Sequence, residues 1–441
     1  MASTKWTCRV DPGGRATLQC ELTEDDGRTN TFRTRIRGVC YSPAPINGRN
    51  DWGPALGDWY WDSFGAITGW QALWHRDRPQ LDRLHLNSLR LYCMLSRQIG
   101  ADGSFPSPWN SGHRFTHKTF LDELCFGARV PPLDRQSKYA LVGIPLPARM
   151  LWKEDYARTS QAEKDYWYGV LEETAQEVGR HPGVIGFTIQ NEQDNADVCY
   201  GNPDRAQFWW SQVERLAGIV KKAAPDKLVG MATHDDPNIP LKALAYMEEC
   251  PSIDFWGVNT YQTANFGSVF EYYRRLEGGA LKPIVLTEWG MPATGHRRAD
   301  TATETFPESI YEDTATRSRA AKVVKHMVPQ AYDHPLCIGL YYFEYCDEWW
   351  NQPNGKRPPE GWKEKKVDTW WGGEVMPGFP NGYWDNDGFG LHSIRRGGAL
   401  PNNAPIWSGN GPTMPIDIHT ERTELTNALA GIFDKVRQHP W

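Results

Sequence analysis

Two stretches of the sequence share a design that strongly limits the possible fold. Residues 184–193 are an apolar run that ends in Asn-Glu at Glu192, and residues 283–290 are another that ends in Glu-Trp-Gly after Glu288. Strands covered on both faces are almost continuously apolar, so each run indicates a buried strand that delivers a carboxylate to the edge of a sheet. The glutamates stand 96 positions apart. At about 30 or more residues per strand-helix-strand unit, this interval accommodates three strand-and-helix steps.

Strand and helix patterns alternate along the rest of the chain. The predicted strands are the apolar runs 35–41, 88–93, 139–146, 184–192, 228–234, 253–259, 284–288 and 337–344. The predicted helices cover residues 78–85, 118–126, 160–180, 203–224 and 421–436. Such alternation favours parallel strands joined by right-handed crossovers. The sequence therefore predicts an α/β fold, a (β/α)8 TIM barrel, with the two glutamates on opposite strands and the functional residues at the carboxyl ends of the strands.

The segments on either side of this series have different patterns. Residues 1–34 contain Gly-rich turns between short alternating segments, which indicates an N-terminal β-hairpin segment at the floor of the barrel. Residues 345–420 are a long Trp-rich stretch before the last helix, and a loop of that length in a compact domain is usually functional. We therefore predict one catalytic domain, residues 35–441, in which residues 345–420 form a wall of the cleft.

Composition narrows the class of partner. The formal net charge is −6 and there is no run of Lys and Arg, so neither nucleic acid nor an anionic membrane is an expected partner. The chain contains 21 Trp and 18 Tyr. Most of the tryptophans are expected to pack in the core, but aromatic rings with a polar edge also suit stacking on sugar rings. This composition favours a neutral carbohydrate as the partner.

The sequence shows no targeting or membrane signal. The N-terminus lacks the apolar core of a signal peptide, and no run of about 18 apolar residues could span a bilayer. As written, the protein is expected to be soluble and cytoplasmic, and it would be secreted if a natural signal had been replaced. The nine cysteines are dispersed without a C-x-x-C pair and are interpreted as buried hydrophobic residues.

No metal or cofactor is expected. His113, His117 and His234 lie in separate loops without the spacing of metal ligands. The stretch Asp385-Asn386-Asp387-Gly388 is too short to form a calcium loop. The oligomeric state stays open.

Polar side chains gather at the ends of the predicted strands. They are Arg90, Asn191, Glu192, His234, Asn259, Tyr261, Glu288 and Glu344. Each alone could be a structural group, but their coincidence at one edge of a barrel indicates a functional site. Two carboxylates that face each other across a cleft are the equipment of a glycosidase.

In these motifs the chain resembles the (β/α)8-barrel clan of retaining glycoside hydrolases, which includes β-galactosidases, β-glucuronidases, cellulases and β-mannanases. The resemblance covers about residues 35–345. It rests on His181-Pro182, Asn191-Glu192, Asn259-x-Tyr261 and Thr287-Glu288-Trp289-Gly290.

The resemblance implies a role for each matching residue. Glu192 would be the acid/base and Glu288 the nucleophile. Asn191 would bind the sugar hydroxyl next to the anomeric carbon, and Arg90 and Tyr261 would orient Glu288. Residues 342–350 are similar to the strand-eight segment of barrel enzymes that act on β-glucans, including transglycosidases. The further substrate-binding candidates are His234, Asn259, Trp289, Glu344 and Trp349.

We therefore expect a retaining hydrolase that cleaves β-linked gluco-configured oligo- or polysaccharides by double displacement. Glu288 must be ionised, whereas burial and the charge of Glu288 should raise the pKa of Glu192. One alternative is a β-glucan transglycosidase, which passes the same intermediate to a sugar hydroxyl. Another is a barrel that binds carbohydrate without catalysis. The linkage and exo or endo action stay open.

Overall fold

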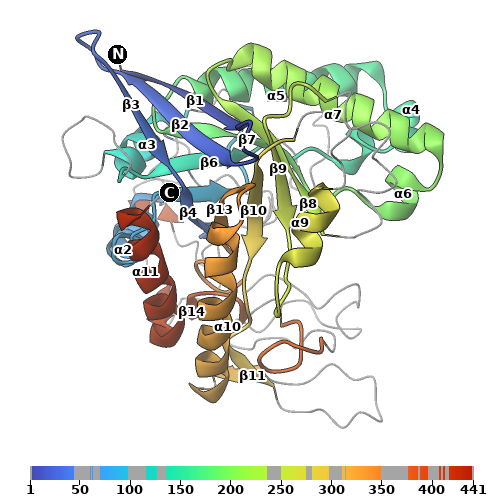
Figure 1. Ribbon diagram of the computed structural model, residues 1–441. Coiled ribbons are helices and arrows are strands. Elements are labelled where there is room, and N and C mark those ends of the chain that lie inside the picture. The colour runs from blue at the N-terminus through green and yellow to red at the C-terminus, as the bar shows by residue number, and fades with distance from the viewer. Residues whose placement is uncertain are drawn as a thin grey trace.

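The computed structural model describes residues 2–43, 60, 62, 70–97, 116–126, 136–235, 250–274, 281–296, 310–312, 314–348, 376–385, 388–395, 407–408, 411–412 and 417–439. Eight parallel strands close into a barrel in the order β10-β13-β4-β5-β6-β7-β8-β9, which confirms the predicted TIM barrel (Figure 1). They are β4 (Ile36–Cys40), β5 (Ser88–Leu91), β6 (Tyr139–Gly143), β7 (Val184–Asn191), β8 (Leu228–His234), β9 (Phe255–Asn259), β10 (Ile284–Trp289) and β13 (Cys337–Tyr342).

Helices surround the barrel (Figure 1). They are α2 (Trp70–Arg83), α3 (Lys118–Cys125), α4 (Lys153–Arg158), α5 (Gln161–Gly179), α6 (Ala196–Tyr200), α7 (Pro203–Ala223), α9 (Gly267–Arg274), α10 (Thr314–Asp333) and α11 (Thr423–Gln438), with a 3-10 turn at Ala148–Met150. Sequence signals set several of the helix starts: the Ser160 and Asn202 side chains cap α5 and α7. The helix predicted at 78–85 begins earlier, at Trp70, and ends at Arg83. Pro79 lies inside α2, although proline usually marks the start of a helix.

The N-terminal segment, described from residue 2 to residue 34, contains three strands, one more than the predicted hairpin. The strands are β1 (Ser3–Val10), β2 (Ala16–Thr23) and β3 (Thr29–Thr34), paired antiparallel in that order. The Trp6 amide donates to the carbonyl of Asp226, just before β8, and the Ala16 amide donates to Pro335, just before β13. The sheet therefore lies across the amino ends of the barrel strands (Figure 1) and leaves their carboxyl ends uncovered by it.

Short strands follow the barrel. They pair as β11 (Thr294–His296) with β12 (Ile310–Glu312), β14 (His392–Arg395) with β17 (Ile418–Glu421), and β15 (Trp407–Ser408) with β16 (Gly411–Pro412). The stretch 345–420, predicted as a long loop, thus contains strand pairing in its described part.

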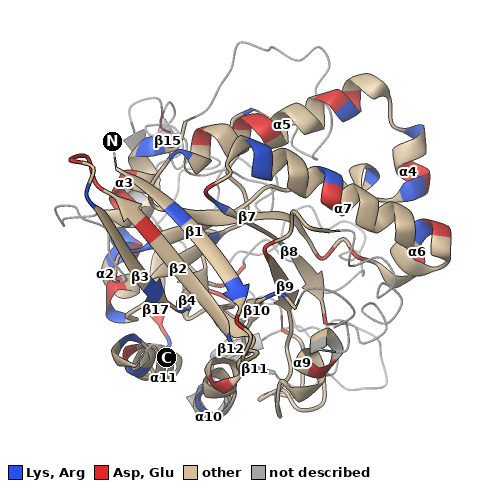
Figure 2. Ribbon diagram, turned by 45° about the horizontal axis from the view of Figure 1, so that its top comes forward, with Lys and Arg blue, Asp and Glu red and all other residues tan. Residues whose placement is uncertain are grey.

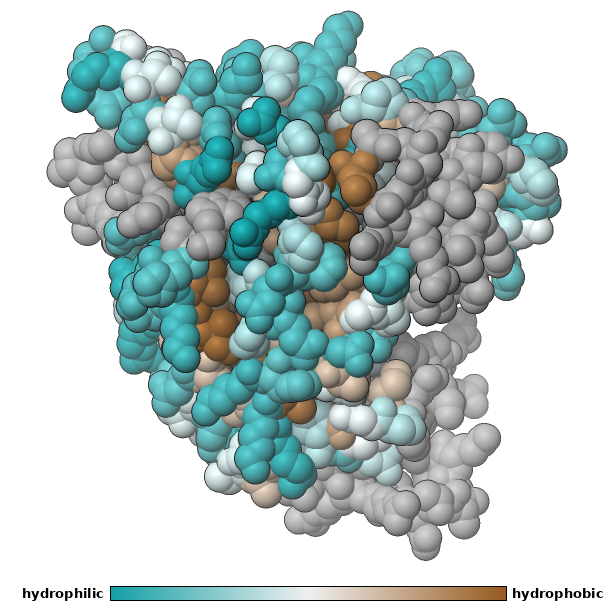
Figure 3. Space-filling view, in the orientation of Figure 1, coloured by the Kyte–Doolittle hydropathy of each residue, from teal (hydrophilic) through white to brown (hydrophobic). Residues whose placement is uncertain are grey.

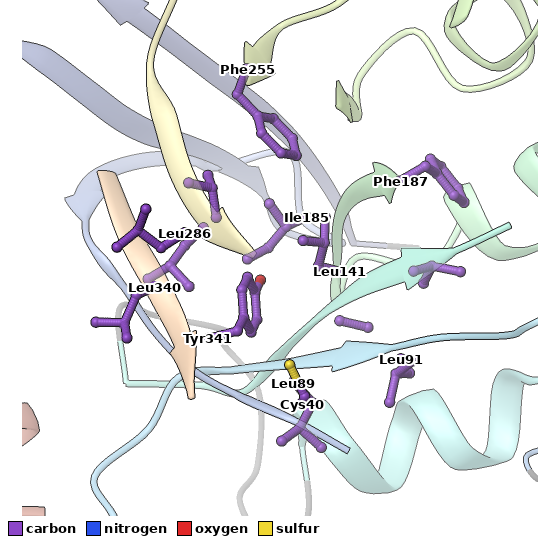
Figure 4. Close-up of a cluster of buried hydrophobic side chains, with 14 of the residues drawn as sticks. Cys40, Leu89, Leu91, Leu141, Ile185, Phe187, Phe255, Leu286, Leu340 and Tyr341 are labelled. Atoms are coloured by element: carbon purple, nitrogen blue, oxygen red, sulfur yellow. The ribbon is translucent and has the colours of Figure 1, made fainter. Parts of the chain in front are cut away.

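Apolar side chains from most of the barrel strands make up the core (Figure 4). Tyr341 of β13 lies inside it, and its hydroxyl is 2.7 Å from the Ser88 hydroxyl of β5. A Cβ atom at position 38 would overlap the Tyr341 ring, so Gly38 of β4 provides the space that this ring occupies. All nine cysteines are free thiols and eight of them are buried, in line with their interpretation as small hydrophobic residues.

The described surface is polar. Basic and acidic residues are interspersed along α4, α5 and α7 (Figure 2). Hydrophilic residues predominate on the face shown in Figure 3, and hydrophobic ones form small separate areas. Among the helices of the described residues, none has the length and apolar character needed to cross a bilayer.

Candidate active site

The carboxyl ends of the barrel strands surround a cleft of about 840 Å³. Glu192, directly after β7, and Glu288, on β10, both line it. Two strands, β8 and β9, stand between β7 and β10 in the barrel. The predicted spacing of three strand-and-helix steps is therefore correct, but in this ring of eight the strand opposite β7 is β13, so the two glutamates are not on opposite strands. The same cleft is lined by five other residues that the sequence singled out: Arg90, Asn191, His234, Asn259 and Tyr261.

Glu288 is held by three donors. Its Oε1 accepts hydrogen bonds from Arg90 Nη1 at 2.6 Å and from the Tyr92 hydroxyl at 2.7 Å, and its Oε2 accepts one from the Tyr261 hydroxyl at 2.8 Å. The residue is only 5% exposed. Charge-assisted hydrogen bonds to a carboxylate are among the strong ones, so these three donors fix the orientation of Glu288.

A polar network joins the surroundings of the two glutamates. Arg90 Nη2 donates to Asn191 Oδ1 at 2.6 Å. The Asn259 amide nitrogen donates to Asn191 Oδ1 at 3.0 Å and to Glu192 Oε1 at 2.9 Å. The Thr287 hydroxyl donates to Asn259 Oδ1 at 2.7 Å, which fixes the Asn259 amide orientation. Residues from β5, β7, β9 and β10 are thereby set in one connected geometry.

Glu192 has a different environment. Its side chain is 33% exposed, and Asn259 is the hydrogen-bond donor to it among the described residues. Burial, followed by the charge of Glu288, raises its pKa from 4.5 to about 7, while His234 acts in the opposite direction. The backbone φ is 53°, a value uncommon for non-glycine residues and often found at functional sites. The Glu192 amide donates to the Ala232 carbonyl of β8 at 2.9 Å, which anchors this conformation.

His234 lies beside Glu192 at the end of β8. Its Nε2 is 3.6 Å from Glu192 Oε2, and its Nδ1 is 3.0 Å from Asp194 Oδ1. The hydrogen bond to Asp194 is the main cause that raises the pKa of His234 to about 9. The imidazole is therefore a cation at neutral pH.

Two predicted residues do not line the cleft within the described part of the chain. Trp289 is fully buried, its Nε1 donates to the Gln262 carbonyl at 2.9 Å, and its ring packs edge-on against Tyr342. Glu344 is 1% exposed, and burial followed by the charge of Glu348 raises its pKa well above the ordinary value. Trp349 lies outside the described residues.

The sequence reasoning missed Tyr92 and Asp194. Tyr92 follows Arg90 by two positions, and alternate residues of a strand share a face, so the period of the strand could have identified it as a second donor to Glu288. Asp194 lies two residues beyond Glu192 in an irregular segment. Its contact with His234 depends on the β7–β8 pairing in three dimensions, and no local pattern indicates it.

Aromatic residues from the stretch after β13 form one side of the cleft. Trp384 lies edge-on to Tyr261 with 4.4 Å between ring centroids, and it packs on Phe379 and Phe389. Met376, Phe379 and Trp384 line the cleft. These three residues belong to the stretch 345–420.

No group of three or more metal-ligating side chains suited to an ion occurs among the residues that the structure describes. His117 is engaged by Glu177, with 2.8 Å between His117 Nδ1 and a carboxylate oxygen. His113 lies outside the described residues.

The arrangement suits proton transfer coupled to nucleophilic attack. One carboxylate is held by three hydrogen-bond donors, and the pKa of the other is raised to about 7. A pair of carboxyl groups whose environments differ in this way can divide the roles of nucleophile and acid/base between them.

Comparisons with known proteins bear on the fold. No model of a protein family matches the chain, and a search among curated proteins finds no match. Solved structures that match include a β-glucuronidase of Bifidobacterium dentium in complex with coumarin-3-O-glucuronide, at 12% identity and a TM-score of 0.50, covering 97% of this chain and 55% of that one.

Two further matches have lower TM-scores. A GH2 β-galacturonidase of Eisenbergiella tayi bound to galacturonate matches at 13% identity and a TM-score of 0.49, covering 95% of this chain and 58% of that one. A mutant of Saccharomyces cerevisiae Gas2p in complex with laminaritetraose and laminaripentaose matches at 13% identity and a TM-score of 0.47, covering 97% and 67%. This chain thus spans between about half and two thirds of the length of these proteins. At such identities the likeness concerns the fold.

Proposed function

We propose that this protein is a retaining glycoside hydrolase that cleaves β-linked gluco-configured oligo- or polysaccharides. The observation that carries the proposal is the difference between the two carboxyl groups of one cleft. Three donors hold the Glu288 carboxylate in one orientation, whereas the pKa of Glu192 is raised to about 7. Retention by double displacement uses one ionised carboxylate to attack and one carboxylic acid to donate a proton.

The proposed reaction has two steps. A Glu288 oxygen attacks the anomeric carbon while Glu192 gives its proton to the leaving oxygen, which yields a glycosyl ester on Glu288 and a free hydroxyl compound. Glu192, now ionised, then takes a proton from a water molecule, and the water oxygen attacks the same carbon and releases Glu288. Each step inverts the anomeric centre, so the product keeps the β configuration.

Asn191 is suited to bind the sugar hydroxyl next to the reacting carbon. Its Oδ1 must face Arg90, because a guanidinium only donates hydrogen bonds. The amide NH₂ group makes no hydrogen bond to other described residues and is therefore available as a donor. This geometry supports the role that the resemblance implies.

The charges of the described lining residues support a neutral sugar. Two cations are among them, Arg90 and His234. Arg90 is paired with Glu288. His234 lies between Asp194 and Glu192. Asp235 and Glu348 add further carboxylates to the same lining. The uronate groups of glucuronides and galacturonides are anions and would meet this negative potential.

A screen of purified protein tests the proposal. The panel contains linkage-defined β-glucans and the 4-nitrophenyl β-D-glucoside, β-D-glucuronide and β-D-galacturonide, with products resolved by size. We expect release from glucosides and shortening of at least one β-glucan, with Glu288→Gln, purified in parallel, as the inactive control. Products longer than the substrate would identify a transglycosidase that uses the same two glutamates. Binding of β-glucans without any product would contradict catalysis.

A further inference from the structure

Asp194, His234 and Glu192 form a chain of side chains that ends at the cleft. Asp194 is fully buried, and its oxygens accept hydrogen bonds from the His234 backbone amide at 3.2 and 3.3 Å and from Nδ1 at 3.0 Å. On the other side of the ring, Nε2 faces Glu192 Oε2 at 3.6 Å. The His234 side chain is 44% exposed, so solvent reaches it.

The buried carboxylate of Asp194 depends on His234 for its hydrogen bonds. Every hydrogen bond made to the Asp194 side chain within the described residues comes from His234. An ionised carboxylate removed from water requires a charged or strongly donating partner. This requirement favours the imidazolium form of the ring, with one N–H directed at Asp194 and the other at Glu192.

We propose that His234, kept cationic by Asp194, is a positioning residue that sets the protonation equilibrium of Glu192. The inference rests on the proposed function, in which Glu192 must be an acid in the first step and a base in the second. The 3.6 Å separation is longer than a hydrogen bond, so the interaction is between charges and not a proton transfer.

Several charged groups act on this pair. Asp194, Glu192 and Asp235 raise the pKa of His234, to about 9, against the effect of burial. Burial, Glu288 and Asp194 raise the pKa of Glu192, whereas His234 and the Asn259 hydrogen bond lower it, and the result is about 7. The imidazolium thus counteracts burial and the nucleophile's charge. Without it, a larger share of Glu192 would be protonated in the free enzyme at neutral pH.

The first arm of the test measures Glu192 directly. Carbon-13 NMR of protein labelled at the glutamate carboxyl carbon follows the titration of Glu192, whose signal is identified by its loss in Glu192→Gln. We expect a midpoint near 7 in the wild type. It should rise above about 8 in His234→Gln, because a cation close to the carboxyl is removed. An unchanged midpoint in His234→Gln would overturn the proposal.

The second arm tests the dependence of His234 on Asp194. Nitrogen-15 NMR of labelled histidine gives the His234 pKa, which should fall from about 9 in the wild type toward about 6.5 in Asp194→Asn. Asp235→Asn is the matched control: it removes a nearby carboxylate that has no hydrogen bond to the ring, so it should lower this pKa less. An equal fall in both variants would contradict the specific role of Asp194. If Asp194→Asn does not fold, the His234→Gln arm alone decides.

A kinetic readout separates this inference from the proposed function. The alkaline limb of kcat/KM for 4-nitrophenyl β-D-glucoside should move to higher pH in His234→Gln together with the NMR midpoint. Absence of turnover in the wild type would contradict the proposed function, while the two NMR titrations would still decide whether His234 sets the protonation of Glu192.

Discussion

The ends of β7 and β10 present the same side chain, a glutamate, to one cleft, and the protein treats the two differently. At the end of β10, Glu288 receives hydrogen bonds from Arg90, Tyr92 and Tyr261. At the end of β7, Glu192 receives one from Asn259, and its pKa is raised to about 7. The residue type is therefore not what distinguishes the proposed nucleophile from the proposed acid/base. The number of donors and the neighbouring charges distinguish them.

The largest effect should come from removing either carboxylate. Glu288→Gln should lower kcat by about 10,000-fold or more on every substrate, because no covalent intermediate can form. Glu192→Gln should lower it by about 100- to 10,000-fold on substrates with poor leaving groups, and much less on dinitrophenyl glycosides, which depart without protonation. Steady-state kinetics with both substrate types checks this. If Glu192→Gln lost as much kcat on dinitrophenyl glycosides as on substrates with poor leaving groups, the two glutamates would not differ in role as proposed.

A smaller effect should follow from removing a single donor to Glu288. Tyr92→Phe and Tyr261→Phe should each reduce kcat by about 10- to 100-fold, because a hydrogen bond to a charged group contributes about 1.5–3 kcal/mol. KM should change little, since the bonds align the nucleophile and act mainly in the transition state. Separate measurement of kcat and KM checks this, and a rise in KM alone would contradict the orienting role.

The smallest effect concerns stability and its dependence on pH. The pKa of Glu192 is about 7 in the folded protein against an ordinary 4.5, so the folded state binds the proton more tightly. The stability linked to this group is fully present below about pH 4.5 and is lost as the pH rises through about 7. Glu192→Gln removes this titration. As the pH rises from about 5 to about 8, the thermal midpoint of the wild type should therefore fall relative to that of Glu192→Gln.

Glu288→Gln is the control for this measurement. It leaves the buried Arg90 without its carboxylate, so it should lower the thermal midpoint at both ends of this pH range. If the midpoint of Glu192→Gln stayed parallel to that of the wild type over this range, the carboxyl would not titrate near pH 7.

The barrel was predictable because each strand carries its own signal. Runs such as 184–192 and 228–234 are apolar, end in polar residues and alternate with helical patterns, and the structure has strands at Val184–Asn191 and Leu228–His234. The N-terminal segment was underestimated, since the polar run Thr29–Thr34 becomes a third strand only through its pairing with β2. Its alternation is weak, and tertiary pairing decides its structure.

The strand ends of the cleft were predictable, and the contacts that differentiate them were not. Arg90, Asn259 and Tyr261 could be selected because each lies at a strand end. The chain from Asp194 to His234 to Glu192 depends on how the segment after β7 packs on β8, which no local period encodes. Trp289 could have been placed correctly: it follows Glu288 directly on β10, so the alternation of a strand directs its side chain to the other face, where it is fully buried.

Azide rescue with product stereochemistry tests the central claim, the division of roles between the two glutamates. In Glu192→Ala, an activated aryl β-glycoside should still form the glycosyl-enzyme, and azide should attack it without base assistance and restore turnover. Two inversions predict the β-glycosyl azide. In Glu288→Ala, azide would take the place of the missing nucleophile and give the α-azide, if any product forms. Proton NMR of the anomeric centre distinguishes the products: a β-azide from the Glu192 variant supports the assignment, and an α-azide from it would show that the two roles are exchanged.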